Sequence, residues 1–99
     1  NGQLFTFDGK INIRNSKYKS DFNYIDNNGI SPMSETYTKA YLHHLFKTEE
    51  ILGYRIATQH NLRFYIHLMK TMQDEIQKGT FEIWAKEFIL QYSGEGILD

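Results

Sequence analysis

The sequence predicts a small α+β fold, in which an N-terminal β-hairpin and a polar loop come before three to four helices. Three observations predict it: apolar and polar residues alternate near the N-terminus, turn-forming residues gather at 20–33, and helical spacing continues over 34–92. A chain of 99 residues, 40% of them hydrophobic, has the size of one packed domain. A complete (β/α)8 barrel needs about 250 residues and is excluded. We expect one subdomain over 1–99, divided into a hairpin (1–19), a loop (20–33), a helical part (34–92) and a frayed tail (93–99).

The hairpin prediction rests on the Asp8-Gly9 pair, which lies between two runs of alternating polarity. An Asp-Gly pair is the strongest short-range signal for a two-residue hairpin turn, because both central positions of such a turn take positive φ. Alternation then places Lys10 and Arg14 on one face of the second strand, opposite its isoleucines.

Helical spacing begins at Ser34, which we predict to be the N-cap of a first helix that ends near Lys47. Thr58 is a further candidate start, so we expect the longest helix to extend from about Thr58 to Lys78. Gly79 then offers the left-handed C-cap that ends many helices. A last apolar stripe at helical spacing follows and comprises Phe81, Ala85, Phe88 and Tyr92.

Charge and composition exclude several classes of function. Eleven Lys and Arg against twelve Asp and Glu give a net charge of -1, so no global field attracts nucleic acid or anionic lipid. The chain has no cysteine, which excludes disulfides and thiolate chemistry, and no apolar run approaches the roughly 18 residues of a membrane span. A local patch without any acidic residue remains, either a solvated strand face or a phosphate-binding surface for nucleic acid: Lys10, Arg14, Lys17 and Lys19.

The first predicted helix has more apolar surface than one core requires. At 100° per residue, Leu42, Leu45 and Phe46 share one face, which we expect to pack into the core. An adjacent strip offers apolar rings with polar tips, a composition found both in cores and in protein interfaces. Its members are Tyr37, Tyr41 and His44, and the residues alone leave core and interface open.

No residue pattern in the chain predicts catalysis. The acidic residues of the helical part fall at predicted helix starts or on polar faces, where they favour solubility. None of the four histidines has an i, i+4 partner of the kind that binds metal on one helix, and His60 and His67 lie two turns apart. We expect structural histidines and no catalytic residue, and a small metal-dependent enzyme built on these histidines is the weakest hypothesis.

Three stretches resemble the C-terminal part of the bacterial tRNA-guanine transglycosylases, or queuine tRNA-ribosyltransferases: TKAYLHHL at 38–45, EILG at 50–53 and TQHNL at 58–62. The likeness extends from Asn1 to about Tyr92 and also covers NGQ at 1–3, DG at 8–9, INIRN at 11–15 and KY at 17–18. It implies a (β/α)8-barrel family of cytoplasmic glycosyltransferases in queuosine biosynthesis, whose aspartate nucleophile helps to exchange the wobble guanine of certain tRNAs for a queuine precursor. The catalytic aspartates would lie upstream of this segment, so we expect the 99-residue chain alone to be inactive.

The resemblance also implies a zinc subdomain, whose ligands in the family are three cysteines and a histidine. Counting along this chain puts Gly29, Ser31 and Ser34 at the cysteine positions and His60 at the histidine position. A serine hydroxyl loses its proton far less readily than a thiol, and glycine has no side chain, so only His60 survives as a ligand. We therefore expect no bound zinc and no other cofactor in this chain.

Family members form homodimers through an aromatic and histidine cluster, which implies that Tyr37, Tyr41 and His44 lie at a dimer interface. The resemblance further implies tRNA as the partner of the complete enzyme, and we assign the tRNA contact to Lys10, Arg14, Lys17 and Lys19. The short apolar runs predict no membrane partner. The expected function is therefore a dimerisation and tRNA-supporting subdomain of a tRNA-guanine transglycosylase. The alternative is a noncatalytic protein-interaction module, a degenerate relative that has lost its zinc.

Overall fold

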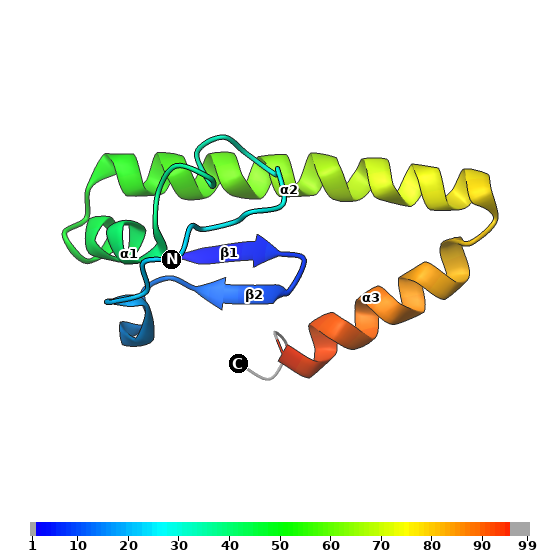
Figure 1. Cartoon of the computed structure of the whole chain (residues 1–99), viewed down its shortest axis with the longest axis horizontal. Coiled ribbons are helices and arrows are strands. Elements are labelled where there is room, and N and C mark those ends of the chain that lie inside the picture. The colour runs from blue at the N-terminus through cyan, green and yellow to red at the C-terminus, as the bar shows by residue number, and fades with distance from the viewer. Residues whose placement is uncertain (1, 96–99) are drawn as a thin grey trace.

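The computed structural model describes residues 2–95, and the side chains of 2–92. It confirms the α+β class, with a two-stranded antiparallel hairpin followed by three helices. α2 runs along one whole side of the molecule, the hairpin and α1 lie beside its first half, and α3 turns back toward the hairpin (Figure 1). In chain order the elements are β1 (Gln3–Thr6), β2 (Gly9–Asn12), the short 3-10 helix η1 (Ser16–Tyr18), α1 (Lys39–Lys47), α2 (Ile51–Lys78) and α3 (Phe81–Glu95).

The hairpin is confirmed, but its turn is centred one residue earlier than Asp8-Gly9. Thr6 pairs with Gly9, so the two turn residues are Phe7 and Asp8, and of the Asp8-Gly9 pair only Gly9 has positive φ, at 123°. The Thr6 hydroxyl donates to the Gly9 carbonyl at 2.6 Å and accepts from the Asp8 amide at 3.1 Å. This side chain holds the turn by hydrogen bonds that the Asp-Gly signal does not include.

The unpaired edge of β1 is covered by two adjacent residues of α2. Asn61 accepts from the Phe5 amide at 3.0 Å and donates to the Gln3 carbonyl at 2.9 Å. His60 donates through Nε2 to the Phe5 carbonyl at 2.7 Å. Because a two-stranded sheet leaves one edge of each strand without partners, these side chains replace a third strand and fix the hairpin against α2.

The first helix begins later than predicted, at Lys39 rather than just after Ser34. Its N-cap is Thr38, whose hydroxyl accepts from the Tyr41 amide at 3.1 Å. Ser34 lies instead in a buried turn, and its side chain contacts His60 on α2. A serine that is engaged by a distant element is not available to cap a helix.

α2 is one helix of 28 residues, so the prediction of a new helix at Thr58 was wrong. Gly53 lies within this helix, and the absence of a side chain there lets α1 approach α2 closely. A Cβ added at Gly53 would lie 2.9 Å from the Leu45 Cβ, which is too close for packed carbons. The predicted C-cap is confirmed, since Gly79 follows Lys78 with φ at 75°.

The core lies where the hairpin, α1 and the first half of α2 meet. The predicted apolar face of α1 is confirmed, since Leu42, Leu45 and Phe46 are buried there. A second cluster forms at the hairpin tip, where the centre of the Phe7 ring lies 4.7 Å from the centre of the Phe64 ring on α2 and 6.3 Å from that of Phe88 on α3. The remaining members of the main core are Leu4, Ile13, Tyr18, Ile25, Ile56 and Ala57.

The last helix is attached to the hairpin by Tyr92, whose hydroxyl donates to the Thr6 carbonyl. Burial, with the charge of Asp8 as a smaller cause, raises the pKa of Tyr92 to about 12, so the hydroxyl keeps its donor proton well into alkaline solution. Of the predicted tail, residues 93–95 belong to α3, and 96–99 lie outside the described residues. Over the part described, no helix has both the length and the apolar character that crossing a bilayer requires.

Candidate functional site

The loop before α1 brings two of the four predicted zinc positions into contact. We call residues 27–35 the serine loop. Ser31, Ser34 and His60 are each at most 1% exposed, and the Ser34 hydroxyl lies 2.5 Å from His60 Nδ1. Gly29 is exposed and has a left-handed backbone, with φ at 73°. The structure therefore joins Ser34 to His60, buries Ser31 and leaves Gly29 at the surface.

The hydrogen bonds of His60 fix which ring nitrogen carries the proton. A carbonyl only accepts, so the 2.7 Å bond to the Phe5 carbonyl requires a proton on Nε2. Nδ1 of the neutral ring is then an acceptor, and the Ser34 hydroxyl donates to it. Burial lowers the pKa of His60 below its ordinary value of 6.5, while the bond to Phe5 and the charge of Asp26 act in the opposite direction. His60 is thus a neutral link between the serine loop, α2 and β1.

The donor set of the serine loop does not fit zinc. It offers one neutral imidazole and two hydroxyls that stay protonated near neutral pH, whereas structural zinc prefers thiolates and imidazoles in a closed tetrahedral set. Ser31 Oγ is buried and has no hydrogen-bond partner among the described residues. The same residues contain no group of three or more His, Cys, Asp or Glu side chains able to hold a metal ion. The absence of zinc stays a prediction, which this donor chemistry supports.

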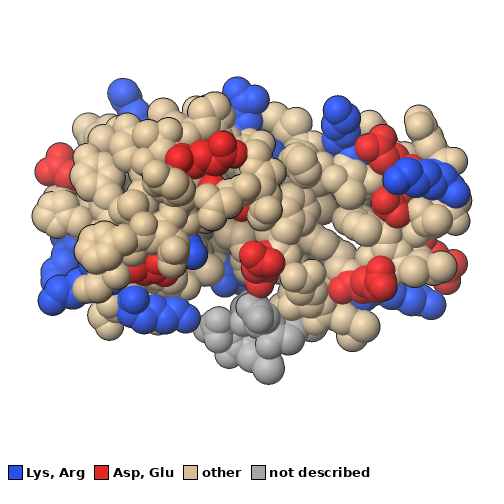
Figure 2. All heavy atoms as spheres, in the orientation of Figure 1, with Lys and Arg blue, Asp and Glu red and all other residues tan. Residues whose placement is uncertain are grey.

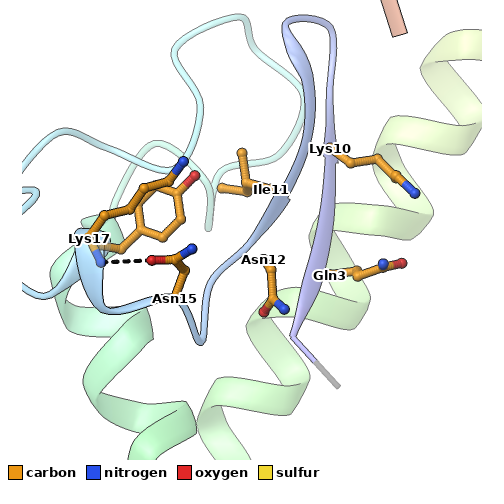
Figure 3. A pocket seen from close by; sticks show the side chains of 7 residues that line it. Gln3, Lys10, Ile11, Asn12, Asn15 and Lys17 are labelled. Carbon is orange, nitrogen blue, oxygen red and sulfur yellow. Dashed lines mark hydrogen bonds between the residues drawn. The ribbon is translucent and has the colours of Figure 1, made fainter. Parts of the chain in front are cut away.

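The four predicted cations divide into two groups instead of sharing one strand face. β2 ends at Asn12, so Arg14 lies in the turn beyond the strand and not beside Lys10. Lys10 and Lys17 line a polar cavity of about 380 Å³, and Figure 3 shows Lys10 and Ile11 pointing to opposite sides of β2. The Lys17 ammonium lies 5.3 Å from the centre of the Tyr18 ring.

The other two cations line a separate cavity, also of about 380 Å³. Arg14 and Lys19 line it together with Ser16, His43 and Lys47. The patch predicted from the sequence did not include these three residues. Figure 2 shows Lys and Arg side chains at this end of the molecule, where Figure 1 labels α1. The missed signal is the spacing of Lys47 and His43, which lie four residues apart and so share one face of α1.

The predicted aromatic strip is not one face of a helix, because Tyr37 precedes the N-cap Thr38 and only Tyr41 and His44 belong to α1. Tyr37 is half-buried and packs against the main core, whereas Tyr41 is 41% exposed and His44 is exposed. The Tyr37 and Tyr41 rings are stacked, with their centres 5.5 Å apart and their planes 22° apart. Two stacked rings with one outer face open form a rigid apolar surface beside a histidine, which is a suitable anchor for a protein partner.

Two of the other three histidines, His43 and His67, have structural contacts. His43 donates through Nδ1 to the Ile13 carbonyl at 2.7 Å, which fastens α1 to the end of the hairpin. The His67 ring meets Phe7 edge to face at 5.3 Å. Neither ring contacts a serine or an acidic residue in these bonds, so neither is arranged as a general base.

Comparison with known proteins confirms the resemblance over almost the whole chain. A family model described as queuine tRNA-ribosyltransferase matches residues 1–94. The queuine tRNA-ribosyltransferases of Francisella tularensis subsp. mediasiatica (strain FSC147), subsp. holarctica (strain LVS) and subsp. novicida (strain U112) are each 49% identical over 92 residues. These matches cover 93% of this chain and 25% of each relative, so the chain spans about a quarter of their length. A match that extends through the hairpin, the serine loop and all three helices makes this chain a member of the queuine tRNA-ribosyltransferase family.

Proposed function

We propose that this chain is the C-terminal dimerisation and tRNA-supporting subdomain of a tRNA-guanine transglycosylase. The whole enzyme exchanges the wobble guanine of tRNA for a queuine precursor, and residues outside this segment supply the catalytic aspartates. The observations that carry the proposal are the exposed cations of the cavity beside α1 and the stacked Tyr37–Tyr41 pair, in a chain that matches a quarter of each relative. Within the enzyme, this segment binds tRNA and forms the dimer contact.

The tRNA contact is assigned to Lys10, Arg14, Lys17 and Lys19. None of them forms an ion pair with a carboxylate in the described part of the chain, where the ion pairs use Lys39, Lys78 and Lys86. Cations without a partner are available to neutralise phosphates, and each such interaction makes binding weaken as salt rises. This surface positions the tRNA without reading its sequence.

Charge reversal at Lys17 or Arg14 should weaken tRNA binding and flatten its salt dependence. Removing one cation from a phosphate lowers the slope of log affinity against log salt by about 0.9. Fluorescence anisotropy with labelled tRNA measures both quantities, and Lys70→Glu, an exposed cation far along α2, is the matched control. Equal binding by Lys17→Glu, Arg14→Glu and Lys70→Glu would count against the patch. Because Arg14 lies over the Phe46 ring and Lys17 over the Tyr18 ring, urea denaturation of both variants is needed to separate an effect on binding from an effect on folding.

Tyr41→Ala should shift the protein from dimer to monomer, because it removes the exposed ring of the stacked pair and leaves the half-buried Tyr37 in the core. Tyr65→Ala is the control, since it removes an exposed tyrosine of α2 outside the strip. Light scattering after size-exclusion chromatography gives the mass at low micromolar concentration. A monomeric unmodified protein, or an unchanged mass in Tyr41→Ala, would refute the dimer assignment.

One observation favours the alternative, a noncatalytic interaction module. The serine loop has a hydrogen bond where the family resemblance implies a metal, as expected of a relative that has diverged from the enzymes. The two functions differ in what the segment does inside an enzyme. A module that has lost the parent function would not support guanine exchange when placed in an active relative.

A further inference from the structure

The cavity beside η1 brings together side chains from three separate parts of the chain. We call it the cation cavity. Arg14 comes from the turn after β2, Ser16 and Lys19 from η1 and its C-terminal cap, and His43 and Lys47 from α1. Its volume of about 380 Å³ exceeds the volume of a phosphate group and leaves room for its hydration.

The charge of the cation cavity is uncompensated. Arg14, Lys19 and Lys47 line it, no carboxylate is among the lining residues, and none of the three forms an ion pair within the described residues. The C-terminal end of α1 accounts for Lys47 alone, because the helix dipole stabilises a cation in the last turn. It does not account for Arg14 and Lys19 beside it. Three neighbouring cations repel one another, and a bound anion removes that repulsion.

Arg14 is held in place without a carboxylate. Its guanidinium lies 5.2 Å from the centre of the Phe46 ring, and Nη2 lies 3.5 Å from the Tyr54 hydroxyl. Stacking on an aromatic ring orients the guanidinium plane and leaves most of its N–H donors free. An arginine fixed in this way is arranged to bind an anion with little loss of side-chain entropy.

His43 adds a nitrogen of defined character to the cavity wall. Its Nδ1 is engaged with the Ile13 carbonyl at 2.7 Å, so Nε2 is the ring nitrogen that remains for a ligand or water. The same bond fixes the position of the ring in α1, one helical turn before Lys47. Among the residues that line the cavity, Arg14 and His43 are thus held by contacts to residues outside it, and Lys19 and Lys47 have flexible side chains that can adapt to a ligand.

We propose that the cation cavity binds one phosphate group of a polynucleotide backbone, with Lys47 as a ligand that the patch predicted from the sequence did not include. The inference rests on the proposed tRNA-supporting function and specifies where one of its phosphates binds. Guanidinium and ammonium groups together recognise phosphate by charge-assisted hydrogen bonds, and the Ser16 hydroxyl supplies a neutral donor. The cavity that contains Lys10 and Lys17 has only two cations, one of them packed on Tyr18.

The test compares Lys47→Gln with Lys70→Gln, which removes the same charge from an exposed position on α2 outside the cation cavity. Labelled tRNA is titrated into each protein at several salt concentrations, and inorganic phosphate is titrated in parallel while the His43 ring signals are followed by NMR. We expect Lys47→Gln to weaken tRNA binding several-fold and to lower the salt slope by about 0.9, with Lys70→Gln unchanged. Lys19→Gln should act like Lys47→Gln, which guards against a local folding defect in one variant.

The outcomes separate the inference from the function on which it rests. If tRNA binds and Lys47→Gln behaves like Lys70→Gln, the cation cavity is not a phosphate site and the proposed function stands. If the unmodified protein shows no salt-dependent tRNA binding, the proposed function and the inference fail together. If inorganic phosphate saturates the His43 signals at sub-millimolar concentration while tRNA leaves them unchanged, the cavity takes free phosphate and the polynucleotide assignment is overturned.

Discussion

Replacing Gly29, Ser31 and Ser34 with cysteine should convert this protein into one that binds a zinc ion per chain. Ser31 and Ser34 are already buried, and Nδ1 of His60 lies 2.5 Å from the Ser34 hydroxyl. A thiol is nearly the same size as a hydroxyl but becomes a thiolate on zinc, so three thiolates and one imidazole complete a tetrahedral set. A structural zinc contributes about 10 kcal/mol or more in small metal-folded domains, which predicts a much higher Tm with zinc than with a chelator.

Gly29 is the position that limits the gain. Its φ of 73° is strained for a side chain and costs roughly 1–2 kcal/mol, but a Cβ there would meet nothing closer than Glu35 Oε2 at 3.7 Å. The Ser31→Cys/Ser34→Cys variant avoids the strain and should bind zinc more weakly than the triple variant. Elemental analysis of the purified proteins measures the metal content. Zinc at one ion per chain in the unmodified protein, or none in the triple variant, would contradict this interpretation of the serine loop.

His60→Ala should destabilise the protein by about 3–5 kcal/mol, because it removes a completely buried ring and two hydrogen bonds together. The Ser34 hydroxyl and the Phe5 carbonyl would be left without a partner in the interior, and the serine loop would no longer be linked to β1. Since small domains are stable by only about 5–15 kcal/mol, this is a large share of the total. Gln73→Ala changes an exposed residue of α2 outside every proposed contact surface and should stay within about 0.5 kcal/mol of the original.

Urea denaturation at neutral pH measures both variants, and equal midpoints for His60→Ala and Gln73→Ala would refute the role given to His60. The same burial predicts acid sensitivity. Because the pKa of His60 is lowered in the folded protein, its stabilisation is complete above about pH 6.5. Below that pH the unfolded chain binds a proton that the folded chain does not, so stability falls until the lower, folded-state pKa is reached.

Features set by neighbouring residues were predictable from the sequence. The hairpin, the buried face of α1 formed by Leu42, Leu45 and Phe46, and the C-cap at Gly79 each depend on side chains within a few positions of one another. Local spacing therefore contains the information for them. The family resemblance was also predictable, because the quoted motifs are short and contiguous.

Features set by distant contacts were not predictable. Ser34 has the local character of an N-cap, yet its hydroxyl binds His60, 26 positions away. No pattern of neighbouring residues predicts the contacts of Asn61, whose side-chain amide forms hydrogen bonds with two backbone groups of β1 more than 50 positions away. The cation patch was divided because β2 ends at Asn12, after which the chain turns and places Arg14 next to α1. Each case depends on which elements pack together, and periodicity within one element does not specify that.

A guanine-exchange assay on a chimera tests the central claim most directly, namely that this segment braces an enzyme without performing its chemistry. The matching segment of the Francisella tularensis relative, 49% identical over 92 residues, is replaced by this chain, and incorporation of labelled guanine into tRNA is measured. We predict activity in the chimera, with Lys17→Glu raising KM for tRNA and leaving kcat nearly unchanged. Absence of exchange in a folded chimera, or guanine exchange by the 99-residue chain alone, would contradict the account.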